Sequence, residues 1–187
     1  MKSKFAAIAI ATSLLGLASI GAHAADGTIT ITGTVTDSTC SINGIASGAQ
    51  ADKAVVLPTV SAGSLATNGA TAGTSSPTDL NFSLSGCTGP ATKAIASFEN
   101  GTNVDQTTGN LKNTASTGPA TNVQVRLLNS SMQPINLTNN SNNTLASNAA
   151  TITSGNALLK YFAQYFATGK ATSGAVNTSV QYTMQYQ

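Results

Sequence analysis

The sequence contains no tryptophan and a single histidine, His23, and only 7% of its residues are charged. His23 lies in a segment that we expect to be removed during export, so the remaining chain has no histidine. This excludes a Ser-His-Asp triad, a Cys-His pair and an ordinary zinc site. The six acidic residues are scattered and form no clustered carboxylate pattern. We therefore expect no catalytic residues, no metal, no cofactor and no enzymatic activity.

Long apolar runs are also missing, apart from one at the N-terminus. Lys2 and Lys4 provide a positive start, residues 5–17 are mainly apolar, and Ala22-His23-Ala24 gives a small-x-small cleavage pattern. The run is shorter than the roughly 18 residues of a membrane span, which predicts a cleaved signal peptide at residues 1–24 rather than an anchor.

The chain that remains after removal of the signal peptide has no excess of either charge. Loss of Lys2 and Lys4 makes the basic residues equal in number to the six acidic ones, so the net charge falls from +2 to zero. The sequence thus contains no basic patch, and we expect no nucleic-acid partner.

Cysteine is rare too, with Cys40 and Cys87 as the only two residues of this type. Both lie in the exported part, where the environment is oxidising, and they form the only possible intramolecular pair. A bridge between them would close a long loop and stabilise the domain by roughly 4 kcal/mol. The alternative is two free, buried thiols.

The remaining chain is rich in Thr, Val, Ile, Ser, Asn and Gly, which is typical of an all-β domain with many turns. Short runs of alternating or apolar residues predict strands separated by polar connections. The candidates are residues 28–35, 53–58, 79–87, 93–98, 122–128 and 176–186. Residues 61–77 have the composition of a loop.

Two stretches are less clear. Residues 157–167 combine helical spacing with the alternation of a strand, and the all-β setting favours the strand. Residues 134–156 are rich in Asn, Ser and Thr, which favours a loop around one or two short strands, with disorder as the alternative.

The first and last strands share an unusual property, because both are regular, uncharged and unprotected by lysine or proline. Exposed edges of this kind pair readily with another chain. The pattern by itself favours ordinary strands of a closed sandwich, and the alternative is a strand that pairs with a second chain, as in donor-strand complementation.

Several motifs follow one another in a fixed order along the chain: Gly27-Thr28-Ile29-x-Ile31-x-Gly33-x-Val35 before Cys40, Leu80-x-Phe82-x-Leu84-x-Gly86-Cys87, Tyr165-x-Ala167-Thr168-Gly169, Gly174, and the ending Val180-x-Tyr182-x-Met184-x-Tyr186-Gln187. This ordered set resembles the pilin subunits of chaperone–usher (type 1-like) fimbriae along essentially the whole chain. The low-complexity stretches at 46–68 and 136–156 depart from the family pattern.

This resemblance implies an immunoglobulin-like sandwich that lacks its last strand and is completed by a donor strand from another subunit. It implies a donor-strand extension at residues 25–36, with inserting residues Ile29, Ile31, Gly33 and Val35, before a pilin domain at 37–187. It also implies a C-terminal strand that forms the edge of the acceptor groove and is captured by the chaperone, through Val176, Val180, Tyr182, Met184, Tyr186 and Gln187.

The function implied is a structural subunit of a fimbrium on the bacterial cell surface, exported through the periplasm and supporting cell adhesion. Its partners would be neighbouring pilin subunits, in a homo- or hetero-polymer, a periplasmic pilus chaperone and an outer-membrane usher. The alternative is a secreted immunoglobulin-like ligand-binding module of the adhesin type. It is weaker because the family's tip adhesins carry an extra N-terminal domain, for which we expect no room here.

Overall fold

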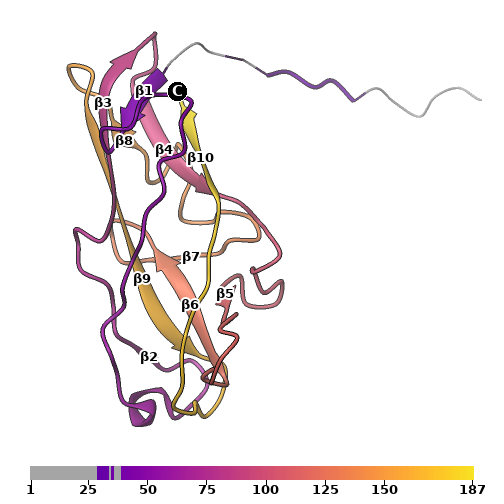
Figure 1. Ribbon diagram of the computed structural model, residues 1–187. Coiled ribbons are helices and arrows are strands. Elements are labelled where there is room, and N and C mark those ends of the chain that lie inside the picture. Colours follow the sequence, from indigo (N-terminus) through magenta and orange to yellow (C-terminus); the bar gives the residue numbers. More distant parts are fainter. Residues whose placement is uncertain (1–28, 34, 36–38) are drawn as a thin grey trace, which may run out of the picture. The chain divides into compact units, whose positions relative to one another are not determined.

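The computed structural model describes residues 29–33, 35 and 39–187, and the predicted signal peptide lies outside them. The chain divides into two units, residues 1–34 and residues 35–187. The second unit is an all-β sandwich (Figure 1). No helix among the described residues has the length and apolar character needed to cross a membrane.

One layer of the sandwich is a seven-stranded antiparallel sheet in the order β1-β3-β9-β6-β5, in which β2 also pairs with β9 and β7 with β6. Its strands are β1 (Thr39–Ile42), β2 (Thr71–Ala72), β3 (Leu80–Thr88), β5 (Leu111–Lys112), β6 (Val123–Leu128), β7 (Pro134–Ile135) and β9 (Ala157–Ala167).

The second layer is a three-stranded antiparallel sheet in the order β10-β4-β8. It consists of β4 (Lys93–Phe98), β8 (Ala150–Thr151) and β10 (Tyr182–Tyr186). The 3-10 helix η1 (Ala62–Leu65) lies in the connection between β1 and β2.

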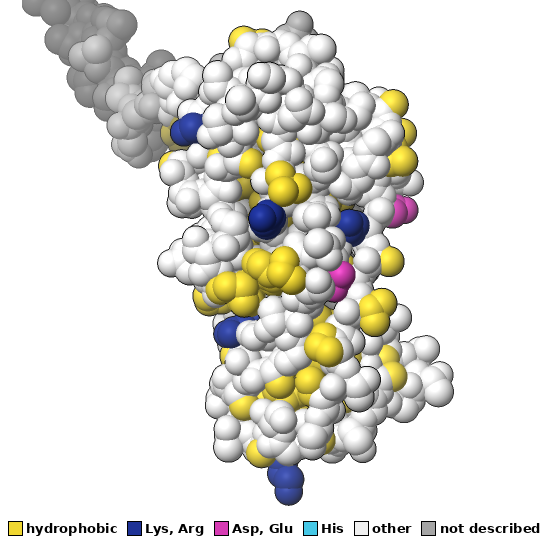
Figure 2. Space-filling model, turned by 90° about the vertical axis from the view of Figure 1, so that its left-hand side faces the viewer, with side chains coloured by type: hydrophobic (Ala, Val, Ile, Leu, Met, Phe, Trp, Pro, Cys, Tyr) yellow, Lys and Arg dark blue, Asp and Glu magenta, His cyan; other side chains and the backbone are white. Residues whose placement is uncertain are grey.

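The core lies between the two layers because alternate residues of the long strands point inward. Leu80, Phe82 and Leu84 of β3 are buried, and Leu159 and Tyr161 of β9 pack in the same cluster. From the opposite sheet, Ala94, Ala96 and Phe98 close this core. Figure 2 shows another face, where hydrophobic side chains appear in several patches and charged ones are few.

A disulfide joins Cys40 of β1 to Cys87 of β3, which confirms the expected pair. The register of these strands shifts between Thr39 and Ser41, so that β3 contributes one extra residue opposite β1. Gly86 lies in this bulge with a φ of 59°, a left-handed conformation that glycine adopts without a steric penalty. The bridge therefore fixes an edge strand of only four residues to its neighbour.

Several predicted elements differ from the observed ones. Residues 53–58 and the described part of 28–35 belong to no strand, and 176–186 forms a strand only over Tyr182–Tyr186. The prediction of a strand at 157–167 is correct, and β9 becomes central because it pairs with both β3 and β6. Residues 134–156 form a loop around β7 and β8, in which Leu137 and Asn143 are buried, so the alternative of disorder is wrong.

Candidate strand-pairing site

Strand β10 is the outermost strand of its sheet and pairs on one side only, with β4. Gln187 and Lys93 exchange two backbone hydrogen bonds of 3.0 and 2.9 Å, and the backbone N–H of Glu99 donates to the carbonyl of Gln181 at 2.9 Å. In an antiparallel pair the bonded residues alternate, so the odd-numbered residues of this strand bond to β4. The backbone groups of Tyr182, Met184 and Tyr186 point the other way, to an edge with no partner strand within the described part of the chain.

The inward side chains of the same segment form a half-buried apolar row. Residues 176–187 alternate between partly buried even positions and exposed odd positions. The apolar members pack against the main core cluster from its rim: Val176, Val180, Tyr182, Met184 and Tyr186. We call these five residues the C-terminal apolar row. A strand at this position in a complete sandwich would be covered by a neighbour, so the row is open to further burial.

A second extended segment, residues 52–60, contributes apolar side chains to the same core. Val55 and Leu57 pack on the core cluster while Val56 points outward, the alternation of a strand. No backbone hydrogen bond of residues 52–60 is formed to any described residue. A side-chain bond of 3.1 Å, from Nζ of Lys53 to Oδ1 of Asn81, ties the segment to β3. The segment therefore has the side-chain pattern of a strand and an unpaired backbone.

Tyr182 connects the two segments. Its hydroxyl donates to the carbonyl of Ala51 at 2.6 Å, and its ring lies 4.6 Å from that of Phe82, centroid to centroid. Burial, with a smaller effect from the charge of Asp52, raises the pKa of Tyr182. Burial likewise raises the pKa of Tyr186. Both phenols thus stay neutral across the physiological range.

The last residue is held by its own domain. The carbonyl oxygen of Gln187 accepts from the backbone N–H of Thr92 at 2.6 Å and of Lys93 at 2.9 Å. The hydroxyl of Thr92 adds a third contact at 3.3 Å. The C-terminal end of β10 is consequently fixed against the start of β4.

The described residues of the N-terminal extension belong to no strand, and their apolar side chains face solvent. Ile29 and Ile31 are 90% and 89% exposed, and Val35 is fully exposed. No heavy atom lies within 4 Å of the position that a Cβ at Gly33 would occupy. Three large apolar side chains at alternate positions in water represent unused hydrophobic burial.

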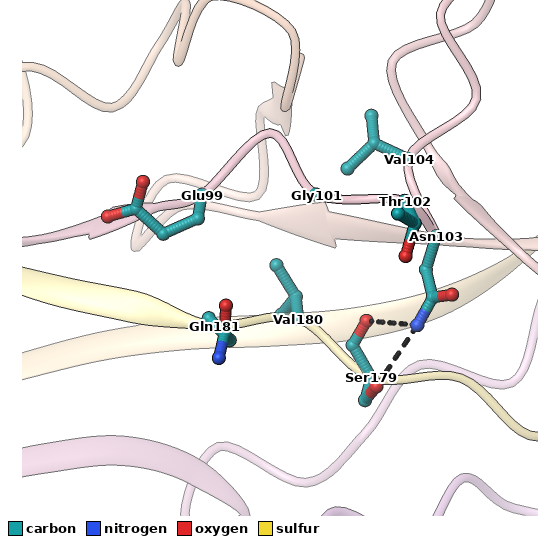
Figure 3. Close-up of a pocket in the computed structure, with 8 residues that line it drawn as sticks. All are labelled: Glu99, Gly101, Thr102, Asn103, Val104, Ser179, Val180 and Gln181. Atoms are coloured by element: carbon teal, nitrogen blue, oxygen red, sulfur yellow. Dashed lines mark hydrogen bonds between the residues drawn. The ribbon is translucent and has the colours of Figure 1, made fainter.

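A small polar pocket adjoins the start of β10 (Figure 3). It has a volume of about 310 Å³ and is lined by Glu99, residues 101–104 and residues 179–181. Nδ2 of Asn103 donates to the backbone carbonyl and to the hydroxyl of Ser179, at 3.1 and 3.0 Å. Among the residues that the structure describes, no group of three or more His, Cys, Asp or Glu side chains could hold a metal ion.

The sequence pattern does not predict that residues 52–60 are neighbours of β10. The sequence of residues 53–58 indicates only a short apolar run that ends at Pro58. Nothing in it indicates which strand would lie beside this run. The contact between Tyr182 and Ala51 joins residues 131 positions apart, and no local pattern reports such a pairing.

Comparisons with known proteins agree with this geometry. A family model described as "Type-1 fimbrial protein, A" matches residues 57–187. The major fimbrial subunit SMF-1 of Stenotrophomonas maltophilia (strain K279a) is 43% identical over 176 residues, covering 92% of this chain and 99% of that protein. The F17 fimbrial protein of Escherichia coli is 42% identical over 171 residues, covering 87% and 88% of the two chains.

Solved structures share the fold. A chain in the structure of a chaperone–usher pilus has a TM-score of 0.54 at 21% identity, covering 87% of this chain and 96% of that one. The P pilus rod subunit PapA has a TM-score of 0.51 at 23% identity, with coverages of 86% and 100%. At these identities the likeness concerns the immunoglobulin-like fold.

Proposed function

The chain belongs to the type-1 fimbrial protein family, and we propose that it acts as a structural subunit of a bacterial surface fimbria that polymerises by donor-strand exchange. Copies of this chain assemble with other pilin subunits into fimbriae, which reach the cell surface through the periplasm. We also propose that a periplasmic chaperone captures each subunit, that an outer-membrane usher assembles it, and that the chain has no enzymatic role.

One observation carries the proposal: the domain has an unpaired edge above a half-buried apolar row, and the extension has exposed apolar residues at alternate positions. A strand laid between β10 and residues 52–60 would pair with the outward backbone groups of Tyr182, Met184 and Tyr186. It would also cover the C-terminal apolar row. Full burial of each large apolar side chain of the extension contributes about 1.5–3 kcal/mol, as an upper estimate.

The proposed donor segment is 25–36, preceding a pilin domain at 37–187, with Ile29, Ile31, Gly33 and Val35 facing the acceptor. Residues 25 to 35 would span roughly 35 Å as a strand. The threonines at the intervening positions keep the segment soluble before it inserts.

The test replaces Ile31 with aspartate and compares it with Thr32→Asp, which adds the same charge on the opposite face of the extension. No basic residue lies in 176–187 to pair with the new charge, so Ile31→Asp would bury an unpaired carboxylate at a cost of several kcal/mol. The variant should fold and accept a donor strand but fail to donate one. Thr32→Asp should donate normally.

The measurement is co-expression of each variant, carrying an epitope tag, with the normal chain, followed by immuno-electron microscopy of the fibres. Ile31→Asp should occur only at a fibre terminus, and Thr32→Asp along its length. Internal incorporation of Ile31→Asp at the frequency of Thr32→Asp would reject the assignment of the donor strand.

A further inference from the structure

Two walls border the proposed acceptor site, and they are held very differently. β10 is bonded along its whole length to β4, and its last residue is fixed to Thr92 and Lys93. The opposite wall, residues 52–60, forms no backbone hydrogen bond to any described residue. An acceptor site with one rigid and one loose wall would have to order the loose wall when a strand enters, at a cost in conformational entropy.

Tyr182 is placed to hold the loose wall. Its backbone belongs to the rigid wall, and its hydroxyl donates at 2.6 Å to the carbonyl of Ala51, the residue that immediately precedes the loose wall. This is the one hydrogen bond between residues 182–187 and residues 51–60 in the described chain. The ring is itself fixed, because it packs against Phe82, which is buried in the core.

From this geometry we infer that Tyr182 is a positioning residue for strand uptake: through Ala51 it links the two walls and holds the loose wall, residues 52–60, in place before a donor strand enters. The inference rests on the proposed function, since it concerns the same acceptor site. Once a donor strand pairs with both walls, that strand orders the loose wall itself. The bridge should therefore act mainly on the rate of strand association and much less on dissociation.

The chain offers a matched control in Tyr186. It lies on the same strand and the same face, is partly buried in the same apolar row, and its hydroxyl has no hydrogen-bond partner among the described residues. Tyr182→Phe removes the bridging hydroxyl and keeps the ring, and Tyr186→Phe removes a hydroxyl without a bridge. Any general effect of removing a tyrosine hydroxyl from this row is common to both variants.

The experiment uses the full exported chain, residues 25–187, with Ile31→Asp in every sample so that subunits do not supply strands to one another. The probe is a synthetic, fluorescently labelled peptide of residues 25–36. Stopped-flow anisotropy gives its association rate, and competition with unlabelled peptide gives its dissociation rate. We expect Tyr182→Phe to slow association about fivefold, the factor equivalent to one hydrogen bond of about 1 kcal/mol. Dissociation should change less than twofold, and Tyr186→Phe should match the parent.

Tryptic cleavage after Lys53, which lies in the loose wall and is exposed, gives an independent readout. Before peptide is added, Tyr182→Phe should be cleaved there severalfold faster than Tyr186→Phe, because the wall opens more often. Bound peptide should abolish the difference.

The outcomes separate the two hypotheses. If the parent chain takes up no peptide, the proposed function fails. If the parent takes it up but Tyr182→Phe and Tyr186→Phe have equal association rates and equal cleavage at Lys53, the bridging role is rejected. A change confined to dissociation would also reject it, since Tyr182 would then act on the completed sandwich.

Discussion

Tyr161 has the largest of the fully buried side chains in the described part of the chain; it is 1% exposed and reaches from one sheet to the other. Its hydroxyl donates to Oδ1 of Asn143 at 3.1 Å and accepts from the backbone N–H of Ala96 at 3.3 Å, while Nδ2 of Asn143 donates to the carbonyl of Ala96 at 2.8 Å. β8 pairs with β4 only at Lys93 and Ala94, so these side chains take the place of a neighbouring strand at Ala96. Satisfied networks of this kind stabilise a core, and partly satisfied ones weaken it.

Removing the hydroxyl of Tyr161 tests this network. Tyr161→Phe leaves the buried N–H of Ala96 without its partner, so the free energy of unfolding should fall by about 1–3 kcal/mol. Tyr165→Phe is the control, because no hydrogen bond of its hydroxyl is formed within the described chain. Denaturant unfolding of subunits complemented by a donor peptide gives both values. Equal losses in the two variants would contradict the network.

The same phenol predicts a pH dependence. Burial raises the pKa of Tyr161 to about 12, above its value of 10 in an unfolded chain. Because the pKa is raised in the folded state, the stability contribution is complete below pH 10 and declines as the pH rises from 10 to 12. Between pH 10 and 12 the free energy of unfolding of the normal chain should fall by on the order of 2 kcal/mol more than that of Tyr161→Phe. Parallel unfolding profiles of the two chains would contradict this.

At the scale of elements, the C-terminal segment shows why a regular pattern can be longer than the strand it forms. Residues 176–181 keep the alternation of β10, but β4 ends at Phe98. Beyond it the segment lies against residues 99–114, which include the two-residue strand β5. There Thr114 N donates to the carbonyl of Asn177, and Asn103 bonds to Ser179. A hydrogen-bonded ladder requires a partner strand on at least one side. Residues 176–181 have no such partner in the described chain, so their side chains alternate although they form no strand.

The C-terminus of β10 provides a prediction about chaperone capture. We propose, as the family resemblance implies, that basic chaperone residues bind a carboxylate at the end of β10, and the ladder to β4 requires the backbone of Gln187. A single glycine added after Gln187 keeps the ladder and displaces the carboxylate, whereas deletion of Tyr186 and Gln187 removes both. We expect the extension to reduce recovery of the chaperone complex severalfold in pull-downs, and the deletion to reduce it further. Full recovery of the extended chain would show that the chaperone does not recognise the carboxylate.

In the molecule as a whole, the segments through which subunits would pair are poor in charged residues. Residues 27–36 contain no charged residue, and neither does the C-terminal segment 176–187. The segments 27–36 and 176–187 are therefore apolar on the inner side and uncharged on the outer side, and the charged residues of the proposed interface are Asp26 of the donor segment and Asp52 and Lys53 of residues 52–60. Attraction at this interface depends on burial and backbone pairing rather than on salt-screened Coulomb forces.

Assembly should consequently be insensitive to ionic strength. Between about 50 and 500 mM NaCl, the rate of donor-peptide uptake should change less than twofold. The reason is that residues 27–36 and 176–187 contribute no charge pairs that a Debye length of roughly 14 to 4 Å could screen. A matched pair, Gln185→Lys in the acceptor and Thr32→Asp in the peptide, adds opposite charges and should make uptake slow as salt rises. A steep salt dependence of the unmodified pair would contradict a neutral interface.

The sequence by itself determined the all-β class, the single disulfide and the principal long strands. These follow from short-range properties: period-two alternation at 79–87 and 157–167, and one cysteine pair in an exported chain. Tertiary structure alone decided which strands are edges. β9 and the segment 176–186 alternate equally well, yet β9 is paired on both sides and β10 on one. Pairing is settled by residues far apart in the chain, as at Tyr182 and Ala51, and alternation reports only which side of a strand faces the core.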